Sequence, residues 1–402
     1  MPAPGSPHIK IKQGDVRIFG YFQPRVRTTR VSFVSAGRST GYQPQPSARI
    51  GAVPGPSFVP AVELSGAFYS EVVRPLLGDR PHAAGLLGWG SDVLGYDTER
   101  STDHGWGPRL LVFLDDVDEQ EREGVECMLD DRLPARFRGW PVRFGWDAVE
   151  TTHHVTVTSL PHWLVDQLGV DATQGMSVLD WLLTPQQRLL GVVAGAVYAD
   201  DLGAVGELRR ALSWYPDQVW RWLLACQWHR LGQEEAFVAR TAEVGDDSGS
   251  AVIAARLVRD MMRLALLLER RYTPYQKWLG TAFARVRHPD HLPTILADVL
   301  SAPDVTRREC ALAEAYTALA RRHNKMGLTG PLEPIIDTYH ERPARVLMAD
   351  RFTEACLATV TDPALRAMPL VGAVDQVVDS VDVLSTPLTY RRLADLYKPG
   401  SS

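Results

Sequence analysis

The residues best suited to chemistry lie between Gly88 and Leu114. An apolar run ends at Gly90-Ser91, and a polar segment with several acids follows, carrying Asp92, Asp97, Asp103 and His104. Backbone N–H groups of a small-residue turn can face a phosphate, because glycine lets the backbone approach closely. Carboxylates about a dozen residues later can hold Mg²⁺, which prefers one or two carboxylates with phosphate oxygens and water. The segment predicts a phosphate and metal site, although Gly90-Ser91 alone is as typical of an ordinary turn.

Regular elements must flank this segment if it is to be held in place. We expect one strand to end at Gly90 and a second to cover the short apolar run Arg109–Leu114. A helix with Ser65 as its N-cap precedes them and should bend or end at Pro75. A polar helix over 118–133 and a strand at Val155–Thr158 follow. Beyond Ser177 the pattern is helical almost throughout, including a helix over 186–198 and the longest one over about 250–271.

Three blocks of this chain resemble a known family. The first comprises Gly90-Ser91, Gly95, Asp97-Thr98, Ser101, Asp103-His104 and Trp106–Arg109; the others are 256–280 and 323–329 with Arg342-Pro343. These residues resemble the bacterial family called domain of unknown function 4037, which is nucleotidyltransferase-like and related to the DNA polymerase beta-like nucleotidyltransferases. The resemblance spans about Phe58 to Tyr397. It implies an α+β fold in which a small mixed sheet with flanking helices precedes a larger helical domain.

The resemblance also implies roles for individual residues. Gly90 and Ser91 would hold the triphosphate of a nucleoside triphosphate, with Arg109 also on the nucleotide, and Asp103 would be the first magnesium-binding acid. In the superfamily a second acid follows two residues later, but that position is Gly105 here, and no acid lies within the strand Val155–Thr158. We expect one Mg²⁺ centred on Asp103, with Asp97 and Glu150 as the substitute ligands. The alternative role for each of these acids is a loop cap or a surface charge.

A basic and aromatic block in the helical part is the second candidate. Arg256, Arg259, Asp260 and Arg263 fall on one helix face, and Tyr275 and Lys277 follow just beyond the helix end. Arg and Lys bind phosphate and aromatic rings can stack on a base. We therefore expect Arg256, Arg259, Tyr275 and Lys277 to face Ser91 across a cleft. The alternative is that Arg256 simply pairs with Asp260.

Two neighbouring histidines and two tryptophans are expected to have structural roles. His153 and His154 are adjacent on a strand, so they point to opposite faces and cannot share one ion. Trp220 and Trp222 are interpreted as core or interface aromatics.

Composition excludes several classes of protein. The 402 residues carry a net charge of −5, which disfavours nucleic acid as a partner. The four cysteines are scattered, as in a cytoplasmic protein, and no apolar run is long enough to span a membrane. We expect an N-terminal extension over 1–57, either poorly structured or the product of a misplaced start, a nucleotidyltransferase-like domain over 58–175 and a helical domain over 176–397.

These observations leave two functions open. The first is Mg²⁺-dependent transfer of a nucleoside monophosphate from a nucleoside triphosphate to a hydroxyl of a small molecule or a protein. The alternative is a catalytically impaired nucleotide-binding protein with the same fold, which Gly105 favours.

Overall fold

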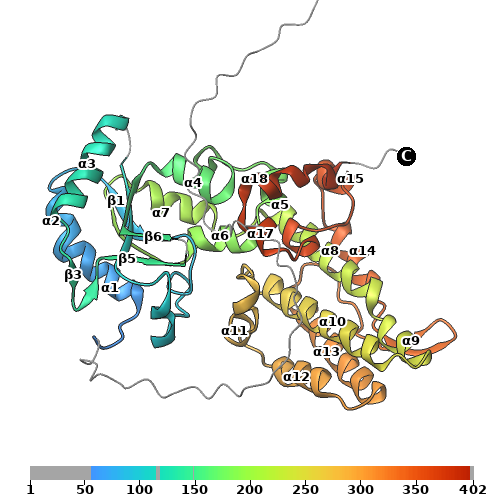
Figure 1. The fold of residues 1–402 in the computed structure, drawn as a ribbon. Helices are drawn as coiled ribbons and strands as arrows, with labels where there is room; N and C mark the ends of the chain where they lie inside the picture. The colour runs from blue at the N-terminus through green and yellow to red at the C-terminus, as the bar shows by residue number, and fades with distance from the viewer. Residues whose placement is uncertain (1–55, 115–117, 148, 399–402) are drawn as a thin grey trace, which may run out of the picture. The chain divides into compact units, whose positions relative to one another are not determined.

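The two apolar segments that flank the acidic loop are neighbouring strands of a five-stranded sheet (Figure 1). The fold is taken from a computed structural model that describes residues 56–114, 118–147 and 149–398. Strand β1 (Ala83–Leu86) pairs antiparallel with β2 (Arg109–Phe113), and β6 (Val149–Thr158) pairs with β2 in parallel. Strands β5 (Arg143–Trp146) and β7 (Ala196–Asp200) complete the two edges, each antiparallel to its neighbour. The order is β5-β6-β2-β1-β7, and the strands expected at 109–114 and 155–158 are confirmed.

Strand β7 was not expected, because the helix predicted over 186–198 ends early. Helix α6 (Gln186–Val193) stops before Gly195, which has φ +70°. A Cβ atom at Gly195 would lie 2.0 Å from the carbonyl oxygen of Leu86, so only glycine allows this close approach. The chain then turns into β7 and pairs with β1, placing a strand of the sheet beyond the boundary expected at residue 175.

One face of the sheet is covered by the N-terminal helices and by α3. The first helix starts at α1 (Ala61–Phe68), so its N-cap is Pro60 and the cap predicted at Ser65 is wrong. A π-helical turn, Tyr69–Val73, leads into α2 (Arg74–Leu77), whose first turn contains Pro75. Proline cannot donate the regular helix hydrogen bond, and a wider turn before it accommodates that loss. Helix α3 (Glu119–Arg132) begins where predicted, with the Asp118 side chain accepting the N–H of Glu121.

The alternation of side chains along β2 divides the core into two clusters. Leu110 and Val112 pack with Leu64 and Phe68 of α1 in one cluster. Phe113, on the other face, packs with Trp163 of α4 (Leu160–Leu168) in the larger cluster that continues through the helical part. The sheet is therefore buried on both faces, as expected for strands that read as continuous apolar runs.

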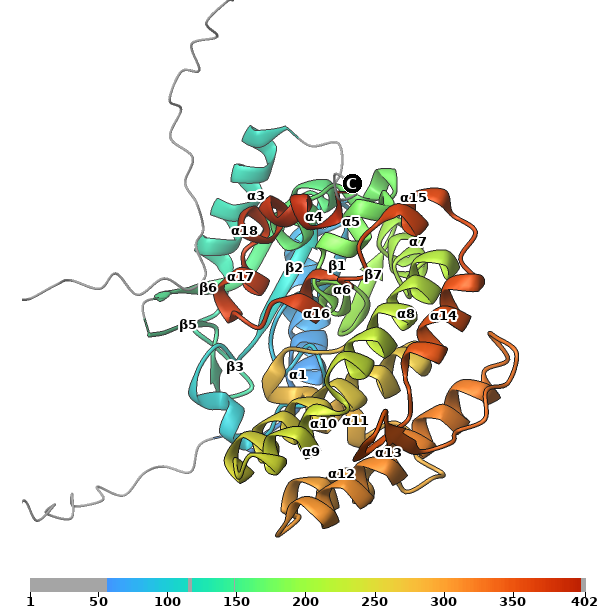
Figure 2. The same ribbon diagram turned by 90° about the vertical axis from the view of Figure 1, so that its right-hand side faces the viewer.

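The remaining elements are mostly helices, together with two small hairpins. The helices are α5 (Val178–Leu183), α7 (Ala204–Ala211), α8 (Asp217–Glu234), α9 (Phe237–Glu243), α10 (Asp247–Leu268), α11 (Leu279–Ala284), α12 (Leu292–Ser301), α13 (Val305–Lys325), α14 (Asp350–Ala358), α15 (Pro363–Ala367), α16 (Val374–Val377), α17 (Val381–Ser385) and α18 (Pro387–Tyr390). The hairpins are β3 (Arg136–Phe137) with β4 (Trp140–Pro141), and β8 (Asp337–Tyr339) with β9 (Arg342–Val346). Helix α8 lies against α10 and α14 (Figure 2).

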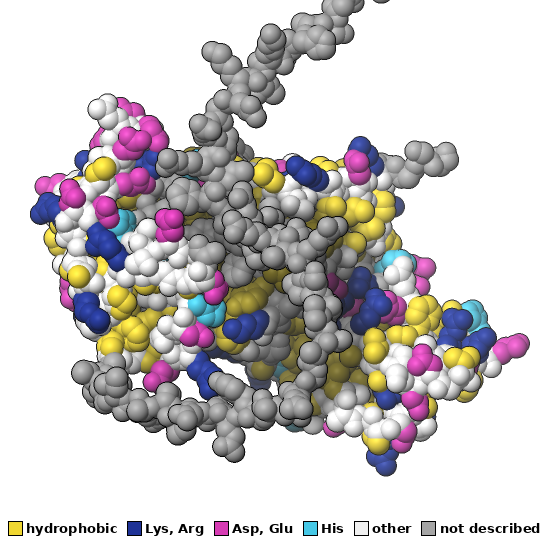
Figure 3. Space-filling model, in the orientation of Figure 1, with side chains coloured by type: hydrophobic (Ala, Val, Ile, Leu, Met, Phe, Trp, Pro, Cys, Tyr) yellow, Lys and Arg dark blue, Asp and Glu magenta, His cyan; other side chains and the backbone are white. Residues whose placement is uncertain are grey.

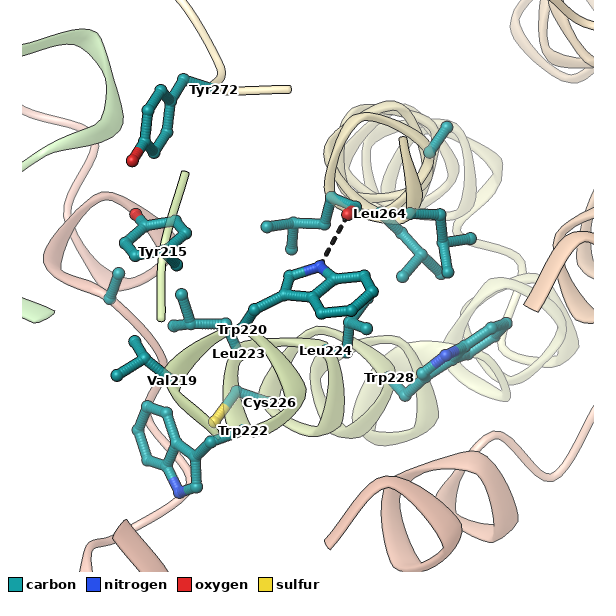
Figure 4. Close-up of a cluster of buried hydrophobic side chains, with 14 of the residues drawn as sticks. Tyr215, Val219, Trp220, Trp222, Leu223, Leu224, Cys226, Trp228, Leu264 and Tyr272 are labelled. Carbon is teal, nitrogen blue, oxygen red and sulfur yellow. Dashed lines mark hydrogen bonds between the residues drawn. The ribbon is translucent and has the colours of Figure 1, made fainter. Parts of the chain in front are cut away.

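Helix α8 is the centre of the helical core. Its side chains Trp220, Trp222 and Trp228 are fully buried, which confirms the core interpretation of the first two. The Trp220 indole N–H donates to the carbonyl oxygen of Leu267 near the end of α10, at 2.8 Å (Figure 4). Because three buried indoles occupy one helix, α8 contacts neighbours on more than one side, as a central core helix does.

The described residues do not test either of the domain boundaries expected near residues 57 and 175. All described residues belong to one compact unit that starts at Pro54, so the boundary at 175 stays a prediction. The expected extension 1–57 lies almost wholly outside the described residues. Among the helices described, none is long and apolar enough to cross a membrane.

A buried carboxyl at the end of α8 gives the fold a pH dependence. Glu235 accepts hydrogen bonds from the backbone N–H groups of Leu347 (2.8 Å) and Ala349 (3.0 Å), which fixes the start of α14. Burial raises the pKa of the Glu235 carboxyl to about 7 and outweighs these two hydrogen bonds, which act in the opposite direction. The folded state therefore holds this proton to a higher pH than the unfolded chain.

We predict that Glu235 costs stability as pH rises from about 4.5 to 7, and that the cost is constant above. A pKa shift of this size corresponds to roughly 3 kcal/mol. Urea unfolding of the parent and of Glu235→Gln from pH 5 to 8 measures this, because the other titrating groups are common to both proteins. The free energy of unfolding of the parent should fall relative to the variant between pH 5 and 7. If the free energies of unfolding of the parent and the variant differ by the same amount at every pH, the raised pKa of Glu235 is contradicted.

Candidate functional site

The loop from Leu87 to Pro108 connects β1 to β2 and carries the predicted Gly-Ser turn. It is anchored at Gly88, whose N–H donates to the carbonyl oxygen of Gly191 in α6 at 2.8 Å. Gly88 and Gly90 have φ of +98° and +118°, which side chains rarely adopt. The Ser91 carbonyl oxygen accepts the N–H of Tyr96 at 2.8 Å, which closes a turn after the Gly-Ser pair. Ser91 is partly exposed, and its hydroxyl has no hydrogen-bond partner among the described residues.

A buried ion pair lies directly beneath Gly90. The Arg109 guanidinium donates to both carboxylate oxygens of Asp92, at 2.7 and 2.8 Å, and to the carbonyl oxygen of Trp89. Its Cζ atom also lies 4.4 Å from the centre of the Trp89 ring. A Cβ atom on Gly90 would lie 2.1 Å from Asp92 Oδ1, so any side chain there would displace the pair. Arg109, predicted to bind nucleotide, thus directs two of its nitrogens at Asp92 and the loop backbone.

The three acids predicted to bind magnesium have different surroundings. Asp97 Oδ2 accepts the backbone N–H of Ala61 (2.8 Å) and the indole N–H of Trp106 (2.9 Å), which ties the loop to the start of α1. Asp103 is exposed and pairs with His104 at 2.7 Å. Glu150 is exposed on β6. These residues do not form a preformed two-metal site, and within 56–114, 118–147 and 149–398 no three His, Cys, Asp or Glu side chains are grouped to hold a metal ion.

The position of the missing second acid has an unusual backbone. Gly105 has φ +63°, and a Cβ atom there would lie 3.2 Å from the Trp89 ring. Aspartate tolerates this left-handed conformation better than most residues. An acid at this position is therefore compatible with the backbone after a small shift of Trp89.

The adjacent histidines have the structural surroundings that the sequence predicted. His154 Nε2 lies 2.8 Å from the carbonyl oxygen of Phe144, and its ring packs on the Phe144 ring. His153 Nδ1 accepts the N–H of Val155 at 3.3 Å. Burial lowers the pKa of both imidazoles, so both are held neutral near pH 7.

The basic residues of α10 are paired with acids. Arg256 pairs with Glu234 at 2.7 Å and Arg259 with Asp379 at 2.8 Å. Asp260, considered as a partner of Arg256, lies instead 2.8 Å from Arg230 and 3.6 Å from Arg263. The acids that pair with Arg256 and Arg259 come from outside α10, 22 and 120 residues away in sequence.

The segment after α10 does reach the loop. The Trp278 ring packs on Tyr96 with centroids 5.1 Å apart, and the Trp278 indole N–H donates to Tyr275 Oη at 2.6 Å. Burial raises the pKa of the Tyr275 phenol, the hydrogen bond from Trp278 acts in the opposite direction, and the charge of Asp92 raises the pKa further. Lys277 is exposed beside the Trp278 ring. Of the four predicted helical-part residues, Tyr275 has the clearest link to the loop.

One residue that contacts the loop, Arg285, was not singled out in the sequence. Arg285, just after α11, donates to the Gly95 carbonyl oxygen at 3.0 Å and lies 4.1 Å above the Tyr96 ring. Nothing in its local sequence distinguishes Arg285 from a surface arginine. Trp278, by contrast, belongs to the aromatic block already singled out.

Basic and acidic side chains are interspersed over the described part of the face shown in Figure 3. The chain as a whole carries a net charge of −5. The expectation that nucleic acid is not a partner stays a prediction.

We predict that Asp92 is structural and Asp103 is not. Asp92→Asn leaves the buried Arg109 without its counter-charge and should lower the free energy of unfolding by about 3–5 kcal/mol. Asp103→Asn changes an exposed carboxylate and should stay within about 0.5 kcal/mol of the parent. Urea unfolding of the three proteins measures both values. Equal stability of the two variants would contradict the role given to the Asp92–Arg109 pair.

Comparisons with known proteins give a family match for part of the chain and a distant structural match. Residues 181–279 match the family model described as Domain of unknown function (DUF4037). No curated protein matches the chain. Among solved structures, a nucleotidyltransferase-like protein from Exiguobacterium sibiricum matches with 14% identity and a TM-score of 0.30, over 76% of this chain and 91% of that chain. The resemblance to the DUF4037 family is confirmed for residues 181–279, the part of the chain from α5 to the start of α11.

Proposed function

We propose that this protein binds a nucleoside triphosphate at the Gly88–Ser91 loop and has lost most of the capacity to transfer the nucleotide. The observation that carries the proposal is the turn fixed by the Asp92–Arg109 pair next to Gly90. Two glycines with positive φ and the Ser91 hydroxyl, which has no partner among the described residues, leave a small-residue turn that a phosphate can approach.

The arrangement of acids supports the impaired form of this function. Two-metal transfer needs carboxylates that bridge both ions. Here Asp92 is engaged by Arg109, Asp97 accepts two N–H groups, and Gly105 replaces the second acid. Asp103 supplies one exposed carboxylate, which suits a single Mg²⁺ held mainly by phosphate oxygens.

Transfer of a nucleoside monophosphate to a hydroxyl of a small molecule or protein is the second candidate. It is favoured by Asp103, whose carboxylate is exposed in the same loop as Ser91. A bound magnesium ion would neutralise charge on the triphosphate. Tyr275 accepts the indole N–H of Trp278, whose ring packs on Tyr96 of the loop, so it is a candidate to line the nucleotide site.

The first prediction tests binding at the loop. Ser91→Leu places a branched apolar side chain where phosphate must approach, so affinity for ATP should fall below detection in calorimetry. Ser70→Leu is the matched control, because Ser70 is exposed and donates only to its own helix at Ala67. Thermal unfolding should show both variants folded. Unchanged ATP affinity in Ser91→Leu would move the phosphate site elsewhere.

The second prediction tests the metal assignment. Asp103→Asn should remove the Mg²⁺ dependence of ATP binding, and Gly105→Asp should strengthen it by adding a carboxylate two residues away. Gly105→Asn is the control, since asparagine also tolerates φ +63° but carries no charge. Titrations with and without Mg²⁺ measure the effect, and pyrophosphate release across the four triphosphates measures transfer. Equal Mg²⁺ dependence of ATP binding in Gly105→Asp and Gly105→Asn would refute the single-ion site.

A further inference from the structure

Arg188 is a partly exposed cation that has no acid partner among the described residues. It lies in the first turn of α6, and its Nη1 donates to Oε1 of Gln167 at 3.4 Å, a long hydrogen bond. Its Nε is buried and has no hydrogen-bond partner among the described residues. Burial lowers the pKa of the Arg188 guanidinium, and the Tyr390 phenol acts in the opposite direction. The Tyr390 hydroxyl is itself buried without a partner among those residues.

Three other arginines with little exposure each have a carboxylate partner. Arg109 is paired with Asp92, Arg322 with Glu269 and Arg391 with Asp180. No carboxylate lies within ion-pair distance of Arg188 in the described part of the chain. Arg188 is partly buried and lacks the counter-charge that each of these three arginines has.

Gln167 lies between the Arg188 side chain and the loop that is proposed to bind phosphate. Its Oε1 accepts from Arg188 and lies 3.9 Å from the position that a Cβ atom on Gly88 would take. Gln167 is 6% exposed, and its Nε2 donates back to the Arg188 carbonyl oxygen at 3.4 Å. The same helix receives the Gly88 N–H at the Gly191 carbonyl oxygen. Helix α6 therefore holds both the loop and the unpaired guanidinium.

We propose that Arg188 binds a phosphate group of the nucleotide from the α6 side of the Gly88–Ser91 loop. The inference rests on the proposed nucleotide binding and adds a cationic ligand that the sequence motifs did not indicate. A guanidinium forms two parallel hydrogen bonds to a phosphate, and no carboxylate competes for the partly exposed Arg188 side chain in the described part of the chain. Arg109 cannot take this role without giving up Asp92.

The experiment compares affinity with ligand-free stability. Calorimetry with inorganic tripolyphosphate and with ATP is applied to the parent, Arg188→Met, Arg188→Lys and Arg210→Met. Arg210 is the matched control, an exposed arginine on α7. Arg188→Met should bind both ligands at least tenfold more weakly, and Arg188→Lys should recover part of the loss. Without ligand, Arg188→Met should unfold at a temperature no lower than the parent, because a partly buried charge without a counter-charge has been removed.

The outcomes separate this inference from the function on which it rests. Unchanged affinity of Arg188→Met for tripolyphosphate overturns the phosphate role of Arg188, while ATP binding by the parent retains the proposed function. A loss for ATP but not for tripolyphosphate also overturns it, since the residue would then contact the nucleoside. If Arg188→Met and Arg188→Lys both unfold at a lower temperature than the parent, Arg188 has a structural role and its proposed phosphate role is overturned. Failure of the parent to bind either ligand removes the proposed function and this inference together.

Discussion

The buried ion pair between Asp92 and Arg109 is the constraint on which the loop depends. It fixes the turn after β1 to the first residue of β2, so the two strand ends and the Gly-Ser pair move as one body. The pair also requires Gly90, because any side chain there would collide with Asp92. A buried pair of this kind contributes little net stability but is costly to break, which suits a role in fixing one conformation.

The helical part supports the loop from two sides. Helix α6 accepts the Gly88 N–H and presents Arg188, and the segment after α10 brings Trp278 and Arg285 against Tyr96 and Gly95. Strand β7 follows α6 directly and pairs with β1, so the same stretch of chain completes the sheet. The loop is thus held by residues about 100 to 190 positions further along the chain.

The local elements were predictable from the sequence, and the long-range pairings were not. Apolar runs predicted β2 and β6, and Asp118 marked the start of α3, because these signals lie within a few residues. Strand β7 was missed because its apolar run continues that of α6 and its partner β1 lies over 100 positions earlier. Arg259 was expected to be available, yet its partner Asp379 is 120 residues away. The acids near Ser91 could be identified by type, but only the fold shows that Arg109 engages Asp92 and that Asp97 caps α1.

The most direct test of the account is a crystal structure of the protein grown with a non-hydrolysable nucleoside triphosphate and Mn²⁺. The account predicts phosphate density against the backbone N–H and hydroxyl of Ser91, with the Asp92–Arg109 pair intact beneath Gly90. An anomalous peak for a single ion beside Asp103 would complete that result. Triphosphate density at another surface, or an Arg109 side chain released from Asp92 to bind phosphate, would contradict it.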